Sequence, residues 1–80
     1  MTGGFGPWAP GLEAAEQLAR LRSLRAIAMG VARWDHVLHA ALRRAETLAP
    51  ADLAAAHAAI ESAPALTKRR LLTSYSELMR

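Results

Sequence analysis

Cysteine is absent from this chain of 80 residues. Its absence excludes disulfide bonds, thiolate nucleophiles and cysteine-ligated zinc sites. Aromatic residues are scarce as well, with Phe5, Trp8, Trp34 and Tyr75 as the only four. The hydrophobic content is 52%, but much of it is alanine, which buries little area when a chain folds. We therefore expect a marginal core that gains stability from self-association or from a partner.

Long apolar runs and catalytic motifs are also missing. No uncharged apolar run approaches the roughly 20 residues that a membrane span needs. The first sixteen residues have neither a basic n-region nor a continuous apolar h-region, so we expect no secretory signal and a cytoplasmic protein. The N-terminal glycines lack the lysine of a phosphate-binding loop, and no serine or threonine has a histidine at a catalytic spacing. We expect no catalytic residue, no cofactor and no small-molecule substrate.

Residues 1–11 differ in composition from the rest of the chain. They contain four of the five glycines and two of the four prolines, which is typical of a loop or arm. A solvated tail rarely carries two large aromatic side chains, so we expect Phe5 and Trp8 to fold back onto the helices or onto a partner. We expect residues 12–80 to form a single helical domain.

Apolar residues recur at spacings of three and four between residues 24 and 48, which predicts an amphipathic helix. Leu18 and Leu21 are out of phase with this stripe, and Gly30 lies close to the change of phase. Either one long helix runs from about 12 to 48, with a possible kink at Gly30, or Gly30 ends a first helix. No Ser, Thr, Asn or Asp is placed to cap a new helix at Val31, so we favour the continuous helix. The apolar stripe comprises Leu24, Ile27, Val31, Trp34, Leu38 and Leu42.

Prolines mark two later helix starts. Pro50 suits the first turn of a helix over 51–62, whose thin apolar stripe is Leu53, Ala56 and Ile60. Pro64 opens the last helix in the same way. That helix carries Leu71, Leu72, Tyr75, Leu78 and Met79 on one side. No strand-like alternation is present, so the sequence predicts an all-α fold, a small helical hairpin or bundle of three to four helices.

The segment RWDHVLHAALRR, residues 33–44, combines residue types that could bind a metal. Asp35 and His39, or His36 and His39, could share a helical face, and His57 could approach if its helix packs antiparallel. Two ligands do not make a competent site, and neither HExxH nor a Glu-x-x-His pair is present. We expect no metal.

Arginine is the stronger signal, because Lys68 is the only lysine and the net charge is +3. GC-rich codons explain this bias without function, whereas the forked guanidinium suits phosphates and carboxylates. On a continuous helix, five arginines and His36 would lie opposite the apolar stripe, and a second cluster opens the last helix. This face is either merely solvated or a docking surface. The basic residues of this face and of the second cluster are Arg22, Arg25, Arg33, Arg43, Arg44, Lys68, Arg69 and Arg70.

These features favour a non-enzymatic helical interaction protein: an adaptor, inhibitor, co-chaperone or structural subunit with a protein partner or a second copy of itself. The apolar stripe would supply its own core or a helix-in-groove interface, with Trp34 as the expected anchor. The alternative is a nucleic-acid-associated protein that uses the arginine-rich face.

Overall fold

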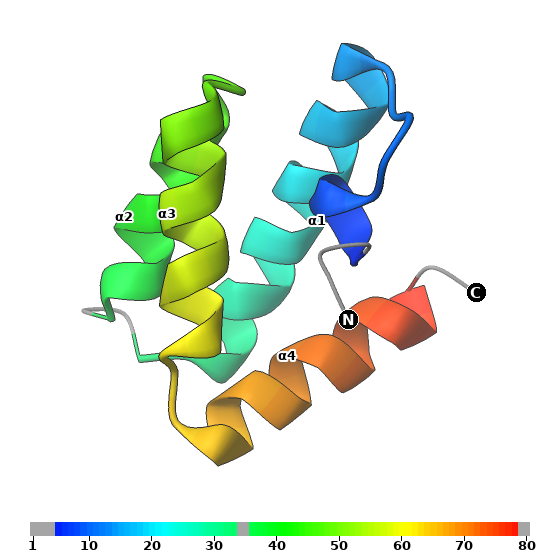
Figure 1. Cartoon of the computed structure of the whole chain (residues 1–80). Coiled ribbons are helices and arrows are strands. Elements are labelled where there is room, and N and C mark those ends of the chain that lie inside the picture. The colour runs from blue at the N-terminus through cyan, green and yellow to red at the C-terminus, as the bar shows by residue number, and fades with distance from the viewer. Residues whose placement is uncertain (1–4, 34–35, 79–80) are drawn as a thin grey trace.

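In the computed structural model the chain is all-α, and the residues that the structure describes form four helices and a short 3₁₀ turn. The structure describes residues 5–33 and 36–78, and no strand occurs among them. The elements in chain order are η1 (Gly6–Trp8), α1 (Ala14–Val31), α2 (Val37–Ala45), α3 (Pro50–Glu61) and α4 (Ala65–Leu78). Helices α1, α2 and α3 alternate in direction, and α4 crosses near the end where α1 stops (Figure 1). None of the described helices is long and apolar enough to span a membrane.

The continuous helix over 12–48 is wrong, because α1 ends at Val31 and α2 begins only at Val37. A straight helix of that length would be about 55 Å long, whereas the greatest extent of the protein is 30 Å. Folding back lets the apolar residues of the two segments face each other, which a single rod would prevent. Gly30 does not end α1 through a left-handed cap, because Ala32 is the C-cap and has an extended backbone.

His36 provides the N-cap of α2. Its Nδ1 accepts a hydrogen bond from the Leu38 N–H at 3.0 Å, which satisfies one of the free donors of the first turn. Histidine is not among the residues usually preferred at this position, and this is why the cap criterion did not predict the helix start. Arg43 and Arg44 lie in the last turn of α2, where positive charge is favourable.

Helices α2 and α3 form an antiparallel hairpin, joined by a short turn. Leu48 adopts a left-handed conformation with φ of 64°, and the Thr47 hydroxyl donates to Asp52 at 2.7 Å. Pro50 lies in the first turn of α3 as predicted. The prediction for Pro64 is also confirmed, because α4 starts at the next residue and Lys68 N–H bonds to the Pro64 carbonyl.

The core lies where the four helices meet. Leu21, which we expected out of phase, is fully buried beside Leu24, so α1 contributes both residues to one face. In α4, Leu71 and Tyr75 are buried as predicted, but Leu78 is 54% exposed. Met79 lies outside the described residues. The buried cluster comprises Leu21, Leu24, Ala28, Leu38, Leu42, Ala45, Ala56, Ile60, Leu71 and Tyr75.

The N-terminal arm, residues 5–8, is docked on the helices. The Trp8 indole N–H donates to the Leu53 carbonyl of α3 at 2.9 Å. The Phe5 ring stacks on Trp8 and meets Tyr75 of α4 edge-on, with ring centroids 5.1 Å apart. The arm therefore folds back onto the chain's own helices, one of the two alternatives that the sequence left open.

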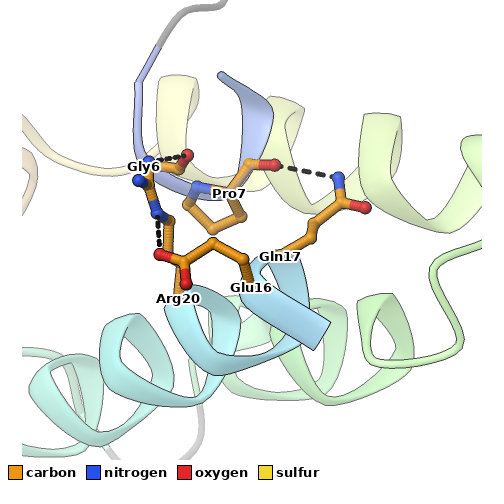
Figure 2. A network of polar contacts seen from close by, with 5 residues as sticks. All are labelled: Gly6, Pro7, Glu16, Gln17 and Arg20. Atoms are coloured by element: carbon orange, nitrogen blue, oxygen red, sulfur yellow. Dashed lines mark hydrogen bonds and ion pairs between the residues drawn. The ribbon is translucent and has the colours of Figure 1, made fainter. Parts of the chain in front are cut away.

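Polar contacts from α1 hold the backbone of the arm (Figure 2). Gln17 donates its side-chain amide to the Pro7 carbonyl at 2.9 Å, and Arg20 donates to the Gly6 carbonyl at 3.2 Å. Glu16 accepts from Arg20 Nε at 2.9 Å, which orients the guanidinium. The Pro7 carbonyl is thus paired by a side chain, and the Gly6 carbonyl, which also accepts from the Ala9 N–H at 3.2 Å, gains a second donor.

Candidate functional site: the groove between α1 and α2

A surface groove of about 580 Å³ lies between α1 and α2. Its apolar part consists of Met29 from α1 and Val37 and Ala40 from α2. Met29 and Val37 are each 71% exposed, so the groove is open to solvent rather than an enclosed cavity. We call it the α1–α2 groove. The lining residues are Arg25, Met29, His36, Val37, His39, Ala40 and Arg43.

Two histidines line the end of the groove that adjoins the α1–α2 link. The Arg33 carbonyl accepts from the His36 backbone N–H at 3.0 Å and from His39 Nε2 at 2.7 Å. His36 Nδ1 is engaged in the helix cap, so its neutral ring carries the proton on Nε2. His39 Nδ1 is buried and has no hydrogen-bond partner among the described residues. The hydrogen bonds of both imidazoles therefore hold the start of α2 in place.

The groove is basic. Each helix contributes one arginine to it, Arg25 from α1 and Arg43 from α2, and none of the described lining residues is acidic. Arg25 donates to Glu46 at 2.8 Å, and Arg22 lies 3.9 Å from the other oxygen of that carboxylate. Arg43 has no ion pair among residues 5–33 and 36–78. Guanidinium groups of this kind bind carboxylates and phosphates.

The predicted apolar stripe belongs mainly to the core. Leu24, Leu38 and Leu42 are fully buried, and Ile27 and Val31 are half-buried against them. These side chains are therefore occupied by contacts within the chain. Trp34, the expected anchor, lies outside the described residues.

The predicted basic residues do not form one continuous face, because the helix that would have aligned them is broken. Arg22 and Arg25 share Glu46, whereas Arg43 and Arg44 lie on α2 and Arg33 lies in the link between them. On α4, Lys68 pairs with Glu61 at 2.8 Å, and Arg69 and Arg70 are exposed. Arg25 and Arg43 line the groove together, and Arg22 joins Arg25 at the carboxylate of Glu46.

Of the residues considered for a metal, His36 and His39 lie together at the groove, whereas His57 lies against the arm. No group of three His, Asp or Glu side chains suited to a metal occurs in the part of the chain that the structure describes. His57 lies edge-on to Trp8, with ring centroids 5.2 Å apart, so its side chain packs against the arm. Asp35 lies outside the described residues.

Sequence reasoning missed Met29, Val37 and Ala40 as candidate site residues. The groove they line arises from the antiparallel packing of α1 and α2, which the continuous helix excluded. One signal was available: Met29 follows Arg25 by one helical turn, which places a large apolar side chain on the charged face of α1. An apolar residue in that position is more informative than one on the core stripe.

Comparison with protein-family models, with curated proteins and with solved structures finds no match to this chain.

Proposed function

We propose that this protein is a non-enzymatic protein-interaction module whose α1–α2 groove binds an acidic, amphipathic helical segment of a partner protein. The observation that carries the proposal is the combination of exposed Met29 and Val37 with Arg25 and Arg43 in one groove. Exposed apolar side chains bordered by charge are typical of helix-in-groove recognition.

Charge complementarity supports an acidic occupant. The described groove lining offers two arginines and no carboxylate, so a partner's Asp or Glu would find donors on both helices. A second copy of this chain would bring the same basic groove, and a symmetric contact between two grooves would oppose like charges. A small molecule would stay largely hydrated, because the apolar lining is so exposed. A separate acidic protein therefore fits the groove best.

Nucleic-acid binding has less support from the arrangement of the basic residues. The eight predicted basic residues are distributed over α1, the α1–α2 link, α2 and α4, and they do not form one continuous face that could follow a phosphate backbone. Met29 and Val37 would gain little from a phosphate backbone, whereas an apolar side chain of a protein would cover them.

The test uses a synthetic helical peptide of about four turns that carries glutamates and leucines on one face. We expect fluorescence anisotropy to show binding to the wild-type chain and weaker binding of a counterpart with lysine in place of glutamate. Met29→Glu should weaken binding of the acidic peptide by about tenfold or more, because it removes an apolar contact and adds a like charge. Leu66→Glu is the matched control, because Leu66 is 56% exposed but lies on α4.

Equal losses for Met29→Glu and Leu66→Glu would contradict the assignment of the groove. A fluorescent DNA duplex serves as the competing ligand. If the duplex binds in a salt-dependent manner and the acidic peptide does not bind, the protein-interaction proposal is wrong and the arginine-rich surface is a nucleic-acid interface.

A further inference from the structure

Glu46 lies beside Arg25, one of the two arginines that line the α1–α2 groove. It is the C-cap residue of α2, and its carboxylate lies between two guanidinium groups of α1. Oε2 accepts from Arg25 at 2.8 Å, and Oε1 lies 3.9 Å from Arg22 Nε. The chain therefore supplies one carboxylate to the arginines that would otherwise be free to bind a partner's carboxylate.

This ion pair differs from the others in the described structure. Glu16 pairs with Arg20 within α1, and Glu61 pairs with Lys68 across α3 and α4, each with a single cation. Glu46 alone among these carboxylates contacts two cations, one of which lines the groove. Arg43, one turn before Glu46, has no ion pair among the described residues. The groove therefore has one arginine available and one covered from within.

We propose that Glu46 is a built-in competitor that a partner's carboxylate displaces from Arg25 and Arg22. This inference rests on the proposed function of the groove. Because Glu46 is tethered beside the arginines, a free carboxylate in solution cannot compete with it at ordinary concentration. A partner displaces it only when apolar contacts with Met29 and Val37 bind the same segment. Glu46 thereby makes the groove selective for segments that are both acidic and apolar.

The partner segment follows from the positions of these residues. Arg25 and Met29 are one turn apart on α1, and Arg43 and Ala40 are nearly one turn apart on α2. The basic end and the apolar end of the groove are therefore about one helical turn apart. A helix with a carboxylate and a large apolar side chain at positions i and i+4, or i and i+3, would contact both ends.

The experiment measures the affinity of the acidic peptide described above for three chains: wild type, Glu46→Gln and Glu61→Gln. Removing the competing charge should tighten binding of the acidic peptide by about three- to fivefold in Glu46→Gln. Glu61→Gln removes an ion pair of the same 2.8 Å length outside the groove and should leave the affinity unchanged. A peptide with glutamine in place of glutamate should not distinguish the three chains.

The outcomes separate the two proposals. If the wild-type chain does not bind the acidic peptide, the proposed function itself fails. If it binds, but Glu46→Gln binds equally or more weakly, the competitor role of Glu46 is wrong. Because Glu46 also links α1 to α2, a second measurement uses the unmodified chain. Saturation with the peptide should shift the NMR resonance of the Glu46 carboxyl carbon and leave that of Glu61 unchanged; an unmoved Glu46 resonance would overturn the proposal.

Discussion

The two edges of α1 offer a direct comparison. Along one edge the N-terminal arm is docked, with its carbonyls paired by Gln17 and Arg20 and its rings packed against α3 and α4. Along the other edge the α1–α2 groove leaves Met29 exposed and Arg43 without an ion pair among the described residues. The arm shows what occupation of a surface of this helix requires: aromatic or apolar side chains together with paired polar groups. The groove offers the same two kinds of contact and lacks an occupant from within the described chain.

The largest expected effect concerns the occupied edge. Trp8→Ala removes the stacking on Phe5, the contact with His57 and the hydrogen bond to the Leu53 carbonyl. We expect it to lower the free energy of unfolding by about 2–3 kcal/mol, because the indole is half-buried. Urea denaturation followed by circular dichroism measures this loss. Trp8→Phe, which keeps a ring but loses the donor, should cost about 1 kcal/mol. A Trp8→Ala chain as stable as wild type would mean that the arm does not contribute to the fold.

Substitution by alanine should change the stability in opposite directions at Gly6 of the arm and at Gly30 of α1. Gly6 has φ of +51°, and a Cβ there would lie 3.2 Å from the Tyr75 ring, so Gly6→Ala should destabilise the protein by about 1–2 kcal/mol. Gly30 lies in α1, and a Cβ there would meet no side chain or other element within 4 Å, so Gly30→Ala should stabilise the protein by about 0.5–1 kcal/mol. Thermal unfolding of both variants gives the comparison. A Gly6→Ala chain at least as stable as wild type would contradict the left-handed backbone of the arm, and a destabilised Gly30→Ala chain would contradict the open position of Gly30.

The smallest expected effect is that of Tyr75→Phe. The Tyr75 hydroxyl is buried without a hydrogen-bond partner among the described residues. Its removal should therefore lower the stability at pH 7 by no more than about 0.5 kcal/mol, or should increase it. Burial raises the pKa of this phenol above its usual 10.0, and the nearby Arg20 partly offsets that increase. The unfolded chain therefore releases the proton first, and stability should fall as the pH rises above 10.

Tyr75→Phe should remove that part of the alkaline loss, while the contributions of all other groups are common to both chains. Urea denaturation of the two chains at pH 8 and pH 11 measures the difference. If both lose the same stability between these pH values, the Tyr75 hydroxyl is not desolvated by the arm.

Local signals in the sequence predicted much of the fold. Pro50 and Pro64 fixed two helix starts because their lost N–H and restricted φ act within one turn. The helix break after Val31 was missed because the apolar period continues across it: Val31 and Leu38 are two turns apart in phase, and both face the same core. Helical periodicity reports burial on a common side and does not require a continuous helix. The histidine cap gave no compensating signal.

The candidate site was less predictable than the fold. Arg25 and Arg43 were among the predicted basic residues, but their positions on two facing helices depend on where the chain turns. Glu46 gave no signal at all, because its contact with Arg22 and Arg25 joins positions about six turns apart in sequence. Contacts of this kind depend on tertiary packing, which residue spacing along one helix does not encode.

The docking of the arm also has a kinetic consequence. The contacts of α2 with α1 and with α3 join neighbours along the chain, and such local contacts form quickly. Phe5 and Trp8, in contrast, contact Tyr75 of α4 and Leu53 of α3, which are far from them in the sequence. The surface on which the arm packs therefore exists only after α3 and α4 have packed. The arm should therefore be the last segment to dock and the first to leave. Substitutions in it should accelerate unfolding and leave the folding rate nearly unchanged, so that the arm sets the lifetime of the native state rather than the speed at which it is reached.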